Sequence, residues 1–207
     1  ELGHALGLKH PFSSLDAGGN KSPEPYLSER EDNSQWTKMS YTFENNDAYF
    51  LTYSPFDIAT LHYLYGPNPQ SRAGNDTYVF DPSDSNFIWD GAGIDWIDAT
   101  NSTEAVTIFL TPGDWRFQGQ NKSNLISSAG QLTINFGTQI ENLLGSGFND
   151  KLFGNELSNE LRGGLGNDSL YGYEGDDFLY GGYGKDKMTG GKGADTYLYN
   201  DINDLGD

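Results

Sequence analysis

The sequence predicts an α+β chain in which a helix- and loop-containing segment, residues 1–66, precedes an all-β region, residues 67–207. Residues 145–198 repeat a glycine-rich nonapeptide six times without an insertion, which predicts a parallel β-roll. Residues 67–144 hold short β-branched and aromatic runs between Gly, Asn, Asp and Pro, which predict further strands. We place the boundary after Gly66, where the composition of the sequence changes.

One helix in the first segment is well signalled. Ser54 suits the N-cap, Pro55 suits the first helical position, and Gly66 ends the helix. A shorter helix is expected over Glu1–Leu6, ended by Gly7. The apolar stripe of the longer helix consists of Ile58, Leu61, Leu64 and Tyr65.

Five short strands are expected in residues 67–144, because apolar and β-branched residues cluster there between turn formers. Apolar residues alternate with polar or small ones in two of these runs, which is the period of a half-buried strand. The expected strands are Asn75–Phe80, Phe87–Asp90, Trp96–Ala99, Ala105–Leu110 and Gln131–Phe136.

The nonapeptide repeat keeps two positions in every unit. The sixth position holds Asp150, Asn159, Asp168, Asp177, Asp186 and Asp195. The eighth holds Leu152, Leu161, Leu170, Leu179, Met188 and Tyr197. One large apolar residue per unit suffices for a core if each unit is a three-residue strand joined to the next by a six-residue turn. Two units then form one coil, and successive coils stack about 4.8 Å apart.

Stacking places the sixth-position carboxylates of alternate units close together, where they repel one another. A calcium ion with about 6–8 oxygen ligands resolves this conflict, and glycines let the turn aim its carbonyls at the ion. The sequence therefore predicts several structural calcium ions. The predicted ligand residues are Asp150, Gly163, Gly164, Gly166, Asp168, Asp177, Gly181, Gly182, Gly184, Asp186, Gly190, Gly191, Gly193 and Asp195. The unit that carries Asn159 is expected to bind poorly. This nonapeptide resembles the calcium-binding unit of RTX proteins.

Two further stretches resemble parts of the same unit. Residues Asp90–Asp98 form one isolated unit, and Gly74–Tyr78 form half of another. For the isolated unit Asp90–Asp98, the sequence does not distinguish a chance match from a genuine calcium-binding turn.

The charge of the chain excludes some partners. Lys and Arg number 12 against 30 Asp and Glu, for a net charge of −18, which argues against nucleic acid and anionic membranes. The chain has no cysteine, so disulfides and thiolate metal sites are excluded. It has no apolar run long enough for a transmembrane helix. We expect a monomer.

The first ten residues, ELGHALGLKH, contain two histidines with metal-ligand spacing. A further histidine immediately before Glu1 would lie one helical turn before His4, on the same face. Glu1 could then act as general base, and a bend at Gly7 could bring His10 to the same ion. Such a sequence, followed downstream by Met39, has the metzincin signature. We therefore expect one catalytic zinc ion, and we expect the sequence as it stands, without the first histidine, to be inactive.

Together with the RTX block, these motifs resemble serralysin-type metzincins. The resemblance implies that His4, His10 and Tyr41 contact zinc, that Glu1 and Tyr41 are catalytic, and that Met39 lies beneath the histidines. It further implies a secreted endopeptidase of a Gram-negative bacterium, which a type I exporter releases and which acts on proteins or peptides. Residues 1–66 would be the C-terminal part of the catalytic domain. Lys38 departs from the small or apolar residue usual before the methionine. The alternative is a non-catalytic, structural or adhesive RTX module whose protease half has decayed.

Overall fold

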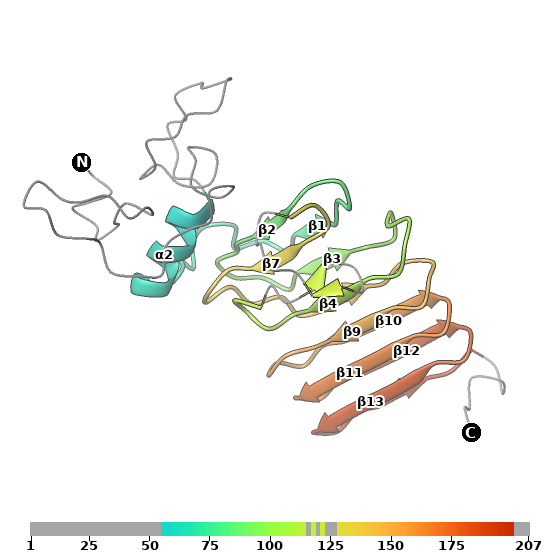
Figure 1. Ribbon diagram of the computed structural model, residues 1–207. Helices are drawn as coiled ribbons and strands as arrows, with labels where there is room; N and C mark the ends of the chain where they lie inside the picture. The colour runs from blue at the N-terminus through green and yellow to red at the C-terminus, as the bar shows by residue number, and fades with distance from the viewer. Residues whose placement is uncertain (1–54, 115–116, 119–120, 123–127, 201–207) are drawn as a thin grey trace, which may run out of the picture. The chain divides into compact units, whose positions relative to one another are not determined.

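The computed structural model describes residues 55–114, 117–118, 121–122 and 128–200 (Figure 1). Contacts divide the chain into two units, Glu1–Gly66 and Pro67–Asp207, and each is described by itself.

The described part of the first unit is helix α2, Pro55–Tyr65, which confirms the longer predicted helix. The N–H of Gly66 donates to the carbonyl of His62 at 2.8 Å, and Gly66 has a φ of 76°. A left-handed glycine of this kind ends a helix, as the sequence predicts. The shorter helix expected over Glu1–Leu6 lies outside the described residues.

Two parallel sheets form most of the second unit (Figure 1). In spatial order, the six-stranded sheet contains β1 (Thr77–Val79), β3 (Trp96–Asp98), β8 (Asn142–Leu144), β10 (Glu160–Leu165), β12 (Phe178–Tyr183) and β14 (Thr196–Leu198). The four-stranded sheet contains β13 (Lys187–Lys192), β11 (Ser169–Glu174), β9 (Lys151–Phe153) and β4 (Thr107–Phe109). From β8 to β14 the chain alternates between the two sheets, so the predicted parallel β-roll is confirmed.

The register confirms that two nonapeptides make one coil. Leu161 pairs with Leu179 across the six-stranded sheet, and Leu170 pairs with Met188 across the other, in each case a separation of 18 residues. The predicted strand length is wrong for β10 to β13, which have six residues each. Pairing continues into the following glycines, as between Gly164 and Gly182, because neighbouring coils also align there.

The core lies between the two sheets, where the eighth-position side chains of successive units meet. The six-stranded sheet contributes Ile97, Leu143, Leu161 and Leu179, and the four-stranded sheet contributes Ile108, Leu152 and Leu170; none of these is more than 2% exposed. Met188, in the last coil, is only partly buried. A single apolar side chain per strand therefore suffices to build this core.

The roll extends beyond the nonapeptide repeat. Tyr78 pairs with Ile97, Ile97 pairs with Leu143, and Ile108 pairs with Leu152, so β1, β3 and β4 form its first coils. Strand β2 (Asn86–Ile88) pairs in parallel with β7 (Leu132–Ile134) beside it. All five strands expected in residues 67–144 are therefore present. The hairpin of β5 (Phe117–Gln118) and β6 (Asn121–Lys122) was not predicted, and neither was β8.

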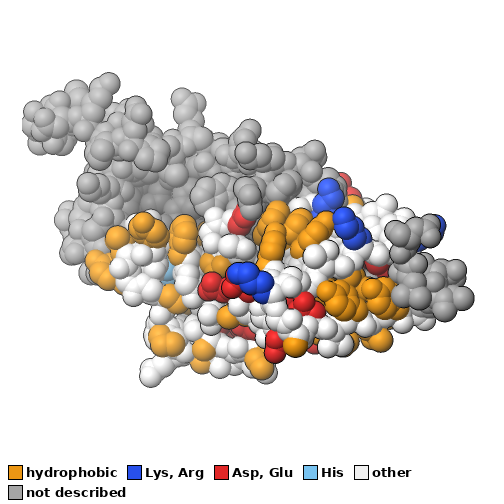
Figure 2. All heavy atoms as spheres, turned by 90° about the horizontal axis from the view of Figure 1, so that it is seen from below, with side chains coloured by type: hydrophobic (Ala, Val, Ile, Leu, Met, Phe, Trp, Pro, Cys, Tyr) orange, Lys and Arg blue, Asp and Glu red, His pale blue; other side chains and the backbone are white. Residues whose placement is uncertain are grey.

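The outer faces of the sheets carry aromatic and other apolar side chains. Phe109, Phe153 and Tyr171 stack along the four-stranded sheet, with ring centroids 4.3 and 5.0 Å apart. Figure 2 shows apolar side chains gathered in several places on one face of the molecule. Among the described residues, no helix reaches the length and apolar character needed to cross a membrane.

Candidate calcium-binding turns

The sixth-position aspartates lie at the corners of the coils, each directly before a strand. Asp168 and Asp186 precede β11 and β13 of the four-stranded sheet, whereas Asp177 and Asp195 precede β12 and β14 of the other. The first three are buried, with 1%, 8% and 2% exposure for Asp168, Asp186 and Asp177. The structure therefore forms two rows of acids, one on each side of the roll, as the repeat predicts.

Backbone hydrogen bonds join the acids of neighbouring coils. The N–H of Asp168 donates to Oδ1 of Asp186 at 2.8 Å, and the N–H of Asp177 donates to Oδ1 of Asp195 at 3.2 Å. The N–H of Asp150 donates in the same way to Oδ1 of Asp168, at 2.7 Å. Each bond fixes one oxygen of a carboxylate and directs the other oxygen into the turn.

The second carboxylate oxygen of these aspartates indicates what the turns could bind. Oδ2 of Asp168 and Oδ2 of Asp177 are buried and have no hydrogen-bond partner among the described residues. Burial raises the pKa of Asp168 to about 7, and the charges of Asp150 and Asp186 act in the same direction. Burial also raises the pKa of Asp177. Buried oxygens without partners are costly, and a hard cation would satisfy them.

The glycines of these turns leave room for the carboxylates. A Cβ added at Gly163 would collide with Oδ2 of Asp168, and one added at Gly172 would collide with Oδ2 of Asp177. The second and fourth positions take φ values between 103° and 139° in Gly164, Gly166, Gly182, Gly184, Gly191 and Gly193. A Cβ added at the predicted first-position glycines Gly181 and Gly190 would likewise collide with Oδ2 of Asp186 and Oδ2 of Asp195. Tyr173 adopts the same left-handed backbone, with a φ of 81°, although it is not glycine.

The first turn of the repeat, residues 145–150, is closed by protein hydrogen bonds. The N–H of Ser146 donates to Oδ2 of Asp150 at 2.6 Å, and its hydroxyl donates to Oδ1 at 2.8 Å. The N–H of Val106 also donates to Oδ1 of Asp150, at 2.8 Å. Asp150 therefore differs from Asp168 and Asp177, and its role as a calcium ligand stays a prediction.

The second turn, residues 154–159, is closed by two buried amides. The side chain of Asn159 accepts from the N–H of Asn155 at 2.8 Å and donates to the carbonyl of Glu141 at 2.9 Å. The side chain of Asn155 donates to the carbonyl of Ile140 at 2.9 Å. The turn has no residue in the left-handed region. This geometry supports the prediction that the Asn159 unit binds calcium poorly.

A second row of hydrogen bonds, which sequence reasoning missed, lies at the fifth position of the units. Oδ1 of Asn149 accepts from the N–H of Asn167 at 2.7 Å, and Oδ1 of Asn167 accepts from the N–H of Lys185 at 2.8 Å. On the other side, Oδ1 of Asp176 accepts from the N–H of Ala194 at 2.7 Å. The signal was present in the sequence, because short polar residues fill this position in the first four units.

Three acids meet in the first coils of the roll. Carboxylate oxygens of Asp76, Asp90 and Asp95 lie within 4.8 Å of one another, an arrangement that could hold a metal ion. Oδ1 of Asp95 accepts from the N–H of Asp76 at 2.7 Å, whereas Oδ2 is buried without a partner among the described residues. Burial raises the pKa of Asp95 to about 6, and the charges of Asp90, Glu141 and Asp76 add to this rise.

The same cluster explains the two isolated stretches of the sequence. Asp76 lies in the half unit and Asp90 and Asp95 lie in the isolated unit, and the pairing of β1 with β3 brings the two together. The chain separation between Asp76 and Asp95 is 19 residues, one more than a coil of the repeat. This separation, close to the length of one coil, could have indicated from the sequence that the two stretches lie on neighbouring coils.

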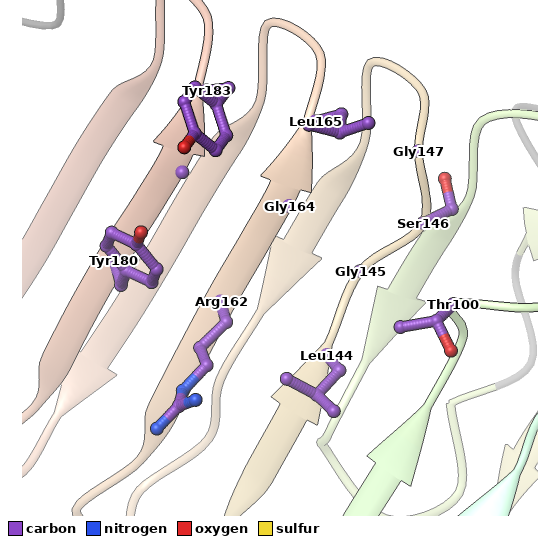
Figure 3. Close-up of a pocket in the computed structure, with 11 residues that line it drawn as sticks. Thr100, Leu144, Gly145, Ser146, Gly147, Arg162, Gly164, Leu165, Tyr180 and Tyr183 are labelled. Atoms are coloured by element: carbon purple, nitrogen blue, oxygen red, sulfur yellow. The ribbon is translucent and has the colours of Figure 1, made fainter. Parts of the chain in front are cut away.

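A groove also lies on the outer face of the six-stranded sheet (Figure 3). It has a volume of about 460 Å³, and its lining includes Leu144, Leu165, Tyr180 and Tyr183 around Arg162. No carboxylate lines it, but Gly164 and Gly182 do, so the groove borders the backbone of the acidic turns.

The predicted zinc half-site lies outside the described residues. This applies to Glu1, His4, His10, Met39 and Tyr41 alike. Their roles therefore rest on the sequence motif alone.

The fold and its turns define a calcium-type parallel β-roll. Residues 162–197 match the RTX calcium-binding nonapeptide repeat in four copies. This match covers the units whose turns combine left-handed backbone with the sixth-position aspartates from Asp168 to Asp195.

Curated proteins extend the similarity beyond the repeat. The chain is 35% identical to serralysin of Proteus mirabilis over 176 residues, which cover 75% of this chain and 34% of that protein. It is 31% identical to metallopeptidase AprA of Pseudomonas marginalis, over 75% of this chain and 36% of the relative. The chain is also 35% identical to serralysin B of Dickeya chrysanthemi, over 73% of this chain and 34% of that protein. The resemblance to serralysin-type proteases with an RTX region is confirmed, and the chain spans about a third of these relatives' length.

Proposed function

We propose that this chain is part of a secreted zinc-dependent endopeptidase whose β-roll folds by taking up calcium. One observation carries the calcium half of the proposal: Oδ2 of Asp168 and Oδ2 of Asp177 are buried without a hydrogen-bond partner among the described residues. The RTX match over residues 162–197 and the relatives named serralysin and metallopeptidase support the same assignment.

The calcium ligands come from neighbouring coils on each side of the roll. Asp168 and Asp186 would share one ion, and Asp177 and Asp195 another, together with carbonyls of the left-handed glycines. Asp150 would contribute less, because each of its oxygens already accepts two hydrogen bonds, from Val106 and Ser146. The oxygen-only donor set fits a hard cation such as calcium.

A further ion would occupy the first coils. Asp76, Asp90 and Asp95 supply three carboxylates, and the buried Oδ2 of Asp95 lacks any other partner among the described residues. Such an ion would join β1 to β3 at the point where the roll begins.

Calcium titration followed by circular dichroism tests this half of the proposal. The double variant Asp168→Asn, Asp177→Asn should need at least about 10-fold more calcium to gain its β signal, because each ion loses a charged ligand and calcium affinity follows the number of charged ligands. The matched control is Asp176→Asn, which removes one charge beside Asp177 but keeps an oxygen to accept from Ala194. Equal calcium dependence in the parent and the double variant would contradict the proposal.

The catalytic half rests on the first segment of the sequence. His4 and His10 would hold zinc with a third histidine before Glu1, and Met39 would lie beneath them. Zinc, when bound, supplies Lewis acidity toward a peptide carbonyl. Glu1 would accept the proton of the attacking water, and the Tyr41 hydroxyl would donate a hydrogen bond to the developing oxyanion. The substrates would be proteins or peptides, outside a Gram-negative cell, after passage through a type I exporter.

Casein hydrolysis by the full-length gene product tests the catalytic half. The Glu1→Ala variant should lose activity by about 100-fold or more, because general-base catalysis is removed. The control is Glu156→Ala, a change of an exposed glutamate on the roll. If the parent has no chelator-sensitive activity, the chain is instead a non-catalytic RTX module.

A further inference from the structure

Two side chains adjoin the acid cluster of Asp76, Asp90 and Asp95 through one of its members, Asp90. The hydroxyl of Tyr78, in β1, donates to Oδ2 of Asp90 at 2.5 Å. Nη1 of Arg72 lies 3.5 Å from the Tyr78 oxygen and donates to it. The three side chains form a chain of hydrogen bonds that ends on a carboxylate of the cluster.

Further hydrogen bonds fix both the backbone and the carboxylate of Asp90. Its Oδ1 accepts from the N–H of Ala92 at 2.9 Å, and its own N–H donates to the hydroxyl oxygen of Thr138 at 3.1 Å. Asp90 is only 1% exposed. Among the described residues, the Tyr78 hydroxyl is the side-chain group that donates to the Asp90 carboxylate, and Tyr78 belongs to β1.

Arg72 is itself fixed by aromatic rings. Its guanidinium carbon lies 4.7 Å from the centre of the Trp89 ring and 5.8 Å from that of Tyr78. Stacking of this kind holds a guanidinium in place while it still donates hydrogen bonds. Arg72 thus brings a positive charge to the outside of a cluster of three carboxylates.

We propose that Tyr78 is a positioning residue for the cation site of Asp76, Asp90 and Asp95, and that Arg72 supports it from outside. The inference rests on the proposed calcium function and adds to it the residues that set the affinity of this one site. Tyr78 holds Asp90 in the orientation that converges on Asp76 and Asp95. Outer partners that orient a metal ligand contribute about 10–100-fold to affinity.

Tryptophan-sensitised terbium luminescence measures this site separately from the repeat. Trp89 adjoins Asp90 and Trp96 adjoins Asp95, whereas residues 145–198 contain no tryptophan. Calcium competition against terbium then gives the calcium affinity of the cluster. Circular dichroism in the same titration reports the repeat.

Tyr78→Phe should weaken calcium binding at the cluster by about 10-fold or more and leave the calcium midpoint of the repeat unchanged. The matched control is Tyr180→Phe, which removes a hydroxyl that donates to Asn200 on the outer face of the roll, at 2.6 Å. This control should leave terbium binding at its parent value.

A double-mutant cycle tests whether Tyr78 acts through Asp90. Once Asp90→Asn has removed the charged ligand, adding Tyr78→Phe should cost little further affinity, because the two changes share one contact. Additive losses would overturn the proposal, as would parent affinity in Tyr78→Phe. A loss explained by a lower melting temperature in chelator would assign Tyr78 a purely structural role and also overturn it. Absence of terbium luminescence in the parent would instead refute the cation site itself.

Discussion

The backbone N–H of Asp150 donates a 2.7 Å hydrogen bond to Oδ1 of Asp168, which lies one coil further along the roll. Asp168 in turn donates its N–H to Asp186, so each carboxylate closes the coil before it. The bond uses one oxygen of Asp168 and leaves Oδ2 buried without a partner among the described residues. The Asp168 side chain therefore both joins two stacked coils and presents a buried oxygen that a cation would satisfy.

The metal-free roll should be more stable in mild acid than above neutral pH. Burial raises the pKa of Asp168 to about 7 from its ordinary value of 3.8, so the folded state binds more protons than the unfolded state between these values. Stability in chelator should therefore fall as the pH rises from about 4 to about 7. Thermal melts in chelator across this range measure the effect, and Asp168→Asn should reduce it. A melting temperature that rises with pH would contradict the assignment.

Gly163→Ala should weaken calcium binding. The added Cβ would collide with Oδ2 of Asp168 and with the carbonyl of Gly181, and relieving such a clash costs about 1–3 kcal/mol. Gly147→Ala is the matched control, because a Cβ there meets no atom within 4 Å. Calcium midpoints of the two variants, measured by circular dichroism, should therefore differ. Equal midpoints would show that the space beside Asp168 is not needed for the ion.

Asn159→Asp should destabilise the roll without creating a calcium site. Aspartate cannot donate to the carbonyl of Glu141, and the loss of one such hydrogen bond costs about 0.5–1.5 kcal/mol. The turn also lacks the left-handed residues of the later turns. The melting temperature in chelator should fall, and calcium should not restore the difference from the parent. A larger calcium-induced rise in the variant than in the parent would show that the turn can bind an ion.

The repeat allowed most of the roll to be predicted from sequence. A strict period of nine, with Leu161 and Leu179 at equivalent positions, determines the coil, the core and the two rows of acids. The six-residue strands were missed because they extend into glycines, which carry little strand propensity.

The first coils could be predicted only in part. Ile97 pairs with Leu143 across a separation of 46 residues, and Tyr78 pairs with Ile97 across 19, so no fixed period joins them. The sequence identified the strands and the acidic stretches, but the cluster of Asp76, Asp90 and Asp95 depends on pairings between strands far apart in the chain. The closed turn around Asp150 was missed for a related reason, since a serine at the second position gave no sign that it would occupy both oxygens.

Hydrogen exchange of the roll with and without calcium tests the central claim most directly. In millimolar calcium, amides of β10 to β13 should be strongly protected, because ions satisfy the buried oxygens of Asp168 and Asp177. In chelator these amides should exchange at least about 100-fold faster, as local unfolding relieves the repulsion between the acids. Equal protection in the two conditions would contradict the account, because the roll would then be held together without calcium.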